Sequence, residues 1–344
     1  MRGGYLLTEF SPGQRQTYRT AAETYRVFLQ ALHQSRNYKG GMHWKRIRGR
    51  QYLYRYRDLL GHGESLGPRG EDTERLFAHF TRERRDAAAR VRAARLRLQE
   101  QARFCRAALI NRVPPAAAKI LRALEQRDLG ENLLVIGTGA LYAYAAGAGV
   151  LLGPPGLLAP ALRGLTLAAA GEMAWEELLQ VARGTDRSFA PLAGAQCRAA
   201  NRDGFQVTLL KSGIKPPGKQ KTITVPGARE PLPLEAGNLN FLMASPKFSQ
   251  VIIGKDGGPA TMVVPDPRAF VLNKLWLSQQ EGREESRRQR DLGQALAVAA
   301  LVLGYLPQYD FFSTDLDMFP QDLAPDAEQW AAEAEATADE SQEY

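Results

Sequence analysis

The sequence is poor in cysteine, which occurs only twice among 344 residues. Cys105 and Cys197 lie far apart, and neither has a Cys or His neighbour at ligand spacing. This pattern argues against a disulfide framework and against a zinc site. The N-terminal segment contains no apolar core of signal-peptide length. We therefore expect a cytoplasmic protein with reduced thiols.

The sequence also has few histidines and few paired carboxylates at the spacing that a metal site or acid–base catalysis requires. The histidines all precede residue 80 and lack metal-ligand spacing, so we interpret them as surface or packing residues rather than catalytic ones. The letters Asp-Leu-Asp at 315–317 stand in a loop after the core, and we do not expect an active site there. The four histidines are His33, His43, His62 and His79.

Charge is missing from residues 132–162, a stretch long enough to raise the question of a membrane span. The sequence Gly-Pro-Pro-Gly interrupts it at 153–156, and alanine and glycine are frequent throughout. A strand, a tightly packed helix and a turn explain this composition better than a membrane helix does. We therefore expect no membrane partner.

The chain has 45 Lys and Arg and 37 Asp and Glu, which gives a net charge of +8. Residues 321–344 contain acidic side chains and no Lys or Arg. The body of the protein is thus more basic than the total suggests. A basic body can attract a polyanion such as nucleic acid. Ordinary solvated surface charge explains the same composition equally well.

The first third of the chain predicts helices around a hairpin. Apolar residues follow a helical period over 17–35 and again over 74–107, where many arginines suit a solvated face. Residues 44–56 alternate basic with aromatic or aliphatic side chains around a glycine, which favours a β-hairpin. Its candidate nucleic-acid contacts are Lys45, Arg46, Arg48 and Arg50. A sheet whose aromatic residues pack on the neighbouring helix is the alternative, and we favour it slightly.

Carboxylates are also missing after a segment whose pattern predicts a phosphate-binding turn. Residues 133–144, LLVIGTGALYAY, indicate a buried strand, a Gly-Thr-Gly turn and the start of a helix. Enzymes of the polymerase-β type hold two metal ions between carboxylates at i and i+2 of one strand and a third carboxylate on a neighbouring strand. Residues 162–167 read LRGLTL and residues 207–210 read VTLL. Neither segment contains a carboxylate.

Several segments together resemble the bacterial nucleotidyltransferase-fold proteins of the Geobacter type, the NTP_transf_8 family, distant kin of the nucleotidyltransferase toxins of abortive-infection systems. The resemblance covers about residues 40–312. It implies an α+β fold whose polymerase-β-type core has a mixed sheet with flanking helices, preceded by a helical region with a β-hairpin and followed by C-terminal helices. The segments are GRQYLY, SLGPRGEDTE, VIGTGALYAYAAGAGV, DRSFAPLAGAQCRAANRDGFQVTLLK, PDPRAFVLNKLWLSQQ and RRQRDLGQA.

The resemblance also implies roles for single residues. Three aspartates of the family pattern fall on Gly164, Thr166 and Thr208, and these residues do not replace carboxylate ligands of Mg²⁺. Each of two matching residues also has an alternative interpretation without nucleotide. Gly137 could serve only to permit tight packing of the strand against the helix, and Lys274 could be an ordinary surface lysine. The residues that match the pattern and are expected to bind nucleotide are Gly137, Thr138, Lys211 and Lys274.

From these patterns we divide the chain into a basic helical region with a hairpin (1–125), a nucleotidyltransferase-like core (126–225), a C-terminal strand and helical subdomain (226–320) and an acidic, disordered tail (321–344). The leading hypothesis is a catalytically inactive protein that binds nucleotide or RNA, with tRNA or a partner protein as candidate partners and no required cofactor. The first alternative is an active enzyme that moves a nucleoside monophosphate from NTP to RNA or protein, with Mg²⁺ and ligands such as Glu172, Glu176 or Asp203. The second is a structural or regulatory protein that binds no nucleotide.

Overall fold

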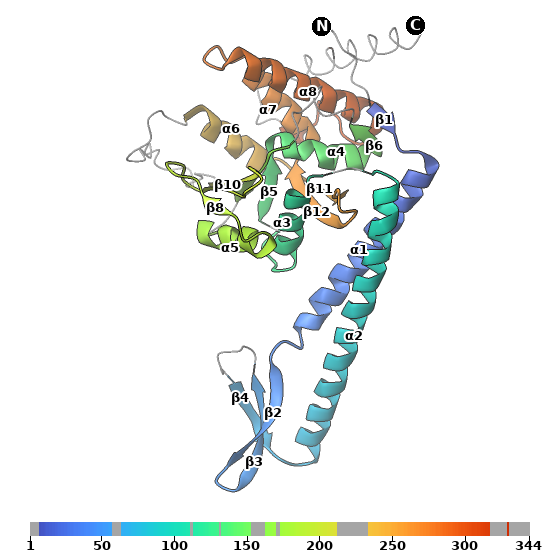
Figure 1. Cartoon of the computed structure of the whole chain (residues 1–344), viewed down its shortest axis with the longest axis vertical. Helices are drawn as coiled ribbons and strands as arrows, with labels where there is room; N and C mark the ends of the chain where they lie inside the picture. The colour runs from blue at the N-terminus through green and yellow to red at the C-terminus, as the bar shows by residue number, and fades with distance from the viewer. Residues whose placement is uncertain are drawn as a thin grey trace. The chain divides into compact units, whose positions relative to one another are not determined.

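The structure, a computed structural model, describes residues 7–56, 63–110, 113–130, 132–152, 162–169, 173–211, 233–316 and 329. Its contacts divide the chain into two compact units (Figure 1). Unit 1 comprises Met1–Arg15 and Ala108–Tyr344, and unit 2 comprises Gln16–Ala107. The architecture is α+β, as the sequence predicts. The finer division at residues 125, 225 and 320 stays a prediction, and the acidic tail lies outside the described residues except for Gln329.

Unit 2 contains most of α1 (Pro12–Arg36) and all of α2 (Glu71–Ala107), which run side by side (Figure 1). The guanidinium of Arg95 on α2 lies 6.0 Å from the ring centroid of Phe28 on α1. The first turn of α2 is acidic, which suits the positive end of the helix dipole. The buried residues of α1 repeat at helical spacing, and they are Ala21, Ala22, Tyr25, Phe28 and Ala31.

The predicted hairpin is confirmed and belongs to a three-stranded antiparallel sheet. It consists of β2 (Gly41–Ile47) and β3 (Arg50–Tyr56), and β4 (Gly63–Pro68) adds a strand that the sequence does not predict. The turn residues Arg48 and Gly49 both have positive φ, 46° and 81°. Positive φ at both positions of a two-residue loop matches the right-handed twist of the strands.

Unit 1 is built on a mixed five-stranded sheet with the order β5-β7-β10-β9-β8. The strand β7 runs parallel to β10, and the other neighbouring pairs are antiparallel. One face of β7 and β10 carries the buried side chains of Leu165, Leu167, Val207 and Leu209, and Ala168 and Ala169 at the end of β7 are buried as well. The strands are β5 (Leu133–Ile136), β7 (Gly164–Ala169), β8 (Ala190–Pro191), β9 (Arg198–Ala200) and β10 (Gln206–Lys211).

Helices and a second hairpin surround this sheet. The hairpin β11 (Lys247–Ile253) and β12 (Pro259–Pro265) contacts β5 and α4, and β1 (Leu7–Glu9) pairs with β6 (Val150–Leu152). No helix among the described residues has the length and apolar composition to cross a membrane. The helices are α3 (Pro115–Glu125), α4 (Leu141–Ala148), α5 (Trp175–Thr185), α6 (Pro233–Ala244), α7 (Pro267–Ser278) and α8 (Glu285–Tyr305), with short 3₁₀ turns η1 (Gly137–Ala140) and η2 (Thr314–Leu316).

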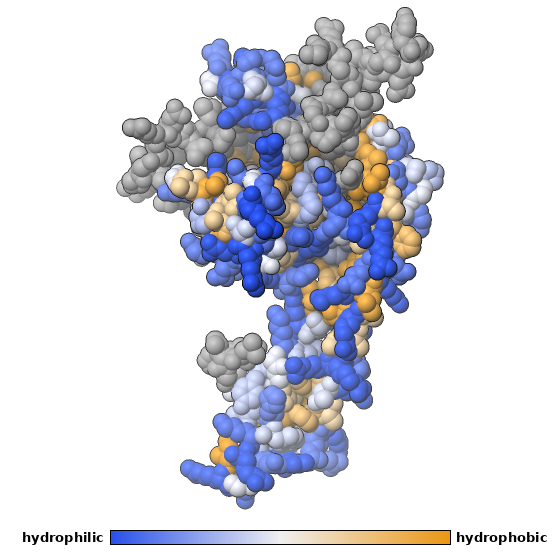
Figure 2. All heavy atoms as spheres, in the orientation of Figure 1, coloured by the Kyte–Doolittle hydropathy of each residue, from blue (hydrophilic) through white to orange (hydrophobic). Residues whose placement is uncertain are grey.

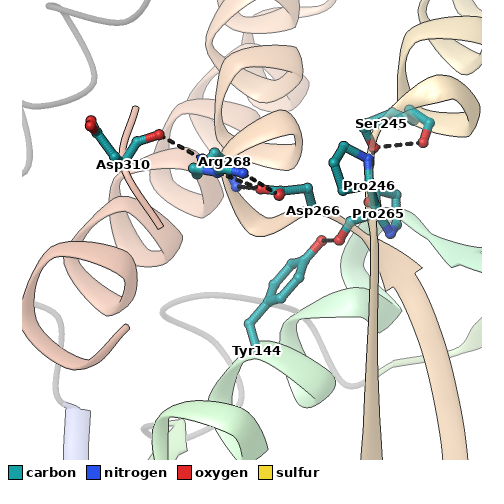
Figure 3. A network of polar contacts seen from close by, with 8 residues as sticks. Tyr144, Ser245, Pro246, Pro265, Asp266, Arg268 and Asp310 are labelled. Atoms are coloured by element: carbon teal, nitrogen blue, oxygen red, sulfur yellow. Dashed lines mark hydrogen bonds and ion pairs between the residues drawn. The ribbon is translucent and has the colours of Figure 1, made fainter. Parts of the chain in front are cut away.

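A buried polar network fixes the start of α7 (Figure 3). The hydroxyl of Tyr144 on α4 donates to the carbonyl oxygen of Pro265 at 2.9 Å. The next residue, Asp266, caps α7 by accepting from the backbone N–H of Arg268 at 2.8 Å. The guanidinium of Arg268 donates to both carboxylate oxygens of Asp266 and, at 2.7 Å, to the carbonyl oxygen of Asp310. The network therefore ties α4, α7 and the segment after α8 together.

The Tyr144→Phe variant tests this network through the pH dependence of stability. Burial, and next the charge of Asp266, hold the pKa of Tyr144 well above its usual 10.0. A raised pKa in the folded state stabilises the protein below pH 10, and this contribution is lost as the pH rises above that value. We expect Tyr144→Phe to lower the free energy of unfolding by about 1–3 kcal/mol at pH 7, because a buried carbonyl loses its donor. Urea unfolding between pH 9 and pH 11 should show a shallower loss of stability in the variant than in the wild type, and equal slopes would contradict this account.

Candidate functional site

The polar residues of β7 and β10 gather on one face of the central sheet. The two strands are parallel, and their register places Thr208 directly opposite Thr166 and Gln206 opposite Gly164. Because side chains two residues apart on a strand share a face, Gly164 and Thr166 lie on the same side. All three of Gly164, Thr166 and Thr208 are half-buried, whereas the residues between them are buried. The three positions on which the aspartates of the family pattern fall therefore lie together on one face of the sheet.

The apolar half of this face is covered. Leu134 and Ala168 pack with Leu239 of α6, and Met243 of the same helix lies against this cluster. The cluster occupies the C-terminal half of β7, whereas Gly164 and Thr166 occupy its N-terminal half. The described part of α6 thus packs on the apolar end of the face, and the half-buried Gly164, Thr166 and Thr208 lie at the other end.

The Gly137–Thr138 turn adjoins this polar end. Ile136, the last residue of β5, pairs with Thr166, so the chain enters the turn beside the threonine pair. Gly137 has φ +67°, a conformation that side chains rarely adopt, and an added Cβ would meet no atom within 4 Å. The turn therefore requires glycine for its backbone conformation rather than for space. The hydroxyl of Thr138 accepts a 2.9 Å hydrogen bond from the side-chain amide of Gln294 on α8.

A buried charge cluster lies one helical turn from Gln294. The carboxylate of Asp291 is fully buried and accepts from Nζ of Lys274 and from Nε of Arg283, both at 2.6 Å. Burial lowers the pKa of Lys274, Asp291 opposes that shift, and Arg283 and Arg290 reinforce it. Two basic side chains, those of Lys274 and Arg283, thus share one buried carboxylate, and Gln294 on the same helix as Asp291 links this cluster to the turn.

The structure places the predicted nucleotide-binding residues unequally. Thr138 is half-buried beside the sheet face, whereas Lys274 is buried and bonded to Asp291. A contact between Lys274 and a nucleotide stays a prediction. Lys211 ends β10, and its side chain lies outside the described residues. Sequence reasoning missed Gln294 and the pairing of Lys274 with Asp291. The available signal was that Asp291 and Gln294 stand where the charged first half of α8 gives way to its apolar second half.

The acidic residues that the active alternative requires are dispersed. Glu176 on α5 and Asp203 in the turn before β10 are exposed, and Glu172 lies outside the described residues. The part of the chain that the structure describes contains no group of three His, Cys, Asp or Glu side chains placed to hold a metal ion. In unit 2, the four basic residues proposed for nucleic acid, Lys45, Arg46, Arg48 and Arg50, are all exposed.

A shallow hollow of about 670 Å³ lies next to the network of Figure 3, lined among others by Pro246, Arg268, Tyr309 and Phe312. Each guanidinium nitrogen of Arg268 is already engaged, with Asp266 or with the carbonyl of Asp310. The charges at this hollow therefore serve the fold, and the sheet face beside the Gly137 turn is the better candidate site.

Comparison with known proteins identifies the class. A family model described as nucleotidyltransferase matches residues 116–316, which is more than half of the chain. The protein belongs to this nucleotidyltransferase family, NTP_transf_8. No curated protein and no solved structure matches the chain.

Proposed function

We propose that this protein has the nucleotidyltransferase fold without the transferase chemistry, and that it binds nucleotide or RNA. The observation that carries the proposal is the grouping of Gly164, Thr166 and Thr208 on one sheet face, at the positions where the family pattern has its aspartates. Mg²⁺ is bound by hard, mostly anionic oxygen ligands. Two neutral hydroxyls and a glycine supply no negative charge, so these residues do not fit the metal pair of the family's chemistry.

The local packing around Gly164 supports the same conclusion. A Cβ added at this position would lie 3.1 Å from the carbonyl oxygen of Gln206 and 3.4 Å from the Cβ of that residue. The first distance is tighter than ordinary van der Waals contact, so a side chain at this position would require the backbone of Gln206 to shift by a few tenths of an ångström. The present packing therefore suits glycine better than a larger residue.

Nucleotide binding is supported by the turn and the charge beside it. The Gly137–Thr138 turn leads through η1 into α4, so backbone N–H groups gather at this end of the site. The cluster around Asp291 places the basic side chains of Lys274 and Arg283 near the turn, to which Gln294 of the same helix is bonded. Backbone donors and positive charge together favour a phosphate group. RNA, including tRNA, is the partner proposed for the exposed basic residues of unit 2.

Two matched glycine variants test the nucleotide site. Gly137 and Gly194 have φ of +67° and +72°, and an added Cβ meets no atom within 4 Å at either position. Alanine should therefore introduce the same backbone strain, about 1–2 kcal/mol, at both sites. We expect Gly137→Ala to weaken the binding of ATP about tenfold or more, and Gly194→Ala to leave it unchanged. Calorimetric titration with ATP should still show binding in excess chelator, because the proposed site recruits no metal.

Two results would count against the site. Equal ATP affinities of the two glycine variants would show that the Gly137 turn does not contact nucleotide. Loss of wild-type binding in the chelator would show that a metal ion takes part.

A further inference from the structure

The sheet of unit 2 has two unlike faces. One face packs on α2, where Trp44 lies 5.8 Å from Phe77 between ring centroids and the guanidinium of Arg55 lies 4.1 Å from the Phe80 ring. Leu53, which pairs with Trp44, is fully buried on this face. The alternation of the strands sends the side chains of the intervening positions to the opposite face.

The opposite face carries a row of aromatic rings, which we call the tyrosine row: Tyr52, Tyr54 and Tyr56 of β3. The rings of Tyr54 and Tyr56 are near parallel, with centroids 6.2 Å apart and an interplanar angle of 27°. From β2, the ring of His43 lies 5.9 Å from that of Tyr56, and Nζ of Lys45 lies 5.4 Å from the Tyr54 centroid. The tyrosines are half-buried, and His43 and Lys45 are exposed. Ring surface therefore remains accessible along the strand.

The charge of unit 2 shows what chemistry would complement this face. Its residues include 21 Lys and Arg but only nine Asp and Glu, a net charge of +12, although the whole chain has only +8. The side chains of unit 2 visible in Figure 2 are mostly hydrophilic. Lys45 and Arg50 share the face of the tyrosine row, and Arg48 stands at the hairpin turn beside it. Flat aromatic rings bordered by cations suit a polyanion that carries flat bases.

Single-stranded nucleic acid is the polyanion that this arrangement can bind. Bases of a single strand can stack on aromatic side chains, whereas bases within a duplex are already stacked on one another. Three phenol hydroxyls and the His43 imidazole also stand on this face, and they can hydrogen-bond a ribose 2′-hydroxyl. DNA lacks that group. The chemistry of the face therefore favours RNA.

We propose that the tyrosine row stacks on the bases of single-stranded RNA while Lys45, Arg48 and Arg50 contact its phosphates. The inference deepens the RNA-binding part of the proposed function and rests on it. Stacking on aromatic side chains is tolerant of sequence, because every base presents a π-face. The bound RNA is therefore recognised by its single-stranded state rather than by its sequence.

The test measures the binding of a fluorescently labelled, mixed-sequence single-stranded RNA of about 20 nucleotides by anisotropy, over a series of salt concentrations. Tyr54→Ala should weaken binding about 5- to 100-fold, and the triple alanine variant of the tyrosine row should weaken it further. The slope of log K against log salt should stay unchanged in these variants. The Arg48→Gln/Arg50→Gln double variant should reduce that slope by about 1.4, because each lost phosphate contact removes about 0.7.

Three controls keep the test specific. Phe104→Ala removes another exposed aromatic ring of unit 2, on α2, and should leave RNA binding unchanged. Tyr54→Ile replaces the ring by a β-branched side chain that also suits a strand, so it should bind as weakly as Tyr54→Ala even where the alanine variant folds poorly. Tyr54→Phe keeps the ring without the hydroxyl, so it should retain DNA affinity and lose part of the preference for RNA.

The outcomes separate the two proposals. If the wild type binds RNA and the Tyr54 variants bind equally well, the tyrosine row is not the binding surface, although the protein still binds RNA. If the wild type binds no RNA, the RNA-binding part of the proposed function fails as well. Equal affinity for duplex and single-stranded RNA would overturn base stacking, and equal affinity for RNA and DNA of the same sequence would overturn the assignment to RNA.

Discussion

Replacement of Asp291 by alanine is expected to lower the free energy of unfolding by about 3–5 kcal/mol, because Lys274 stays buried without its carboxylate. Asp291 is fully buried and bonds both Lys274 and Arg283 at 2.6 Å. Burial lowers the pKa of Lys274, and the charge of Asp291 opposes that shift. Urea unfolding monitored by circular dichroism measures the loss.

The pH dependence gives this prediction a second readout. Without Asp291, the pKa of Lys274 in the folded state should fall further below its usual 10.5. Between the folded and the unfolded pKa, the unfolded chain binds more protons, so the free energy of unfolding rises with pH. The defect of Asp291→Ala should therefore shrink as the pH approaches 10. A defect that is independent of pH would show that Lys274 is not the destabilising charge.

Two matched variants complete this experiment. The Asp291→Leu/Lys274→Met double variant removes both members of the buried pair and should recover much of the lost stability. Glu71→Ala breaks an ion pair with Arg75 in which both side chains are exposed, and it should change stability by less than about 1 kcal/mol. A loss in Glu71→Ala as large as that in Asp291→Ala would contradict the importance of burial.

Introduction of two carboxylates, Thr166→Asp and Thr208→Asp, should make the stability of the protein depend on Mg²⁺. The two positions face each other on parallel neighbouring strands, which lie about 4.8 Å apart. Like charges at that distance repel, so the double variant should unfold at a lower temperature than the wild type at pH 7. Mg²⁺ at 100 times its dissociation constant would raise the free energy of unfolding of the double variant by about 2.7 kcal/mol. Thermal unfolding with Mg²⁺, compared with NaCl at equal ionic strength, measures the response.

The matched control is the Thr166→Asn/Thr208→Asn double variant, which has similar volume and no charge. It should show no response specific to Mg²⁺. An aspartate variant that is insensitive to Mg²⁺ would contradict the geometry of the two positions. Gly164 is left unchanged because an added Cβ would crowd Gln206.

The sequence predicts the parts of this protein that depend on local patterns. The basic and aromatic alternation around Gly49 predicts the hairpin of β2 and β3, and the Gly-Thr-Gly segment predicts a strand, a turn and a helix. The two strand segments could be placed in one sheet only through the family pattern. Their parallel register, with Thr166 opposite Thr208, is a contact between residues 42 positions apart, and it required the structure.

The charge cluster was less predictable for a physical reason. Lys274 lies among apolar residues of α7, and a lysine there can point either to solvent or to a buried carboxylate. The choice depends on how α7 packs against α8, where Asp291 is fully buried. The tyrosine row presents a similar case. The alternation of the strand separates its two faces, but only the contact of Trp44 with Phe77 shows which face α2 covers.

Family membership and the proposed loss of transferase chemistry concern the same sheet. The match over residues 116–316 and the mixed sheet establish the nucleotidyltransferase class. The same sheet presents a glycine and two threonines on the face beside the Gly137 turn. A fold can persist after its catalytic groups are replaced, because the packing of the sheet depends on the buried face rather than on the site. The proposed binding of nucleotide and the proposed binding of RNA lie on unit 1 and unit 2 respectively, so the two can be tested separately.

The most direct test of the central claim is a nucleotidyl-transfer assay. The purified protein is incubated with labelled ATP, CTP, GTP and UTP, with Mg²⁺ or Mn²⁺ and total tRNA, and the label in tRNA and in the protein is counted alongside the nucleotide bound at equilibrium. We predict bound nucleotide and no label transferred to either acceptor. Transfer of label that disappears with the metal would contradict the account, and it would show that acidic residues other than those at positions 164, 166 and 208 hold the metal ions.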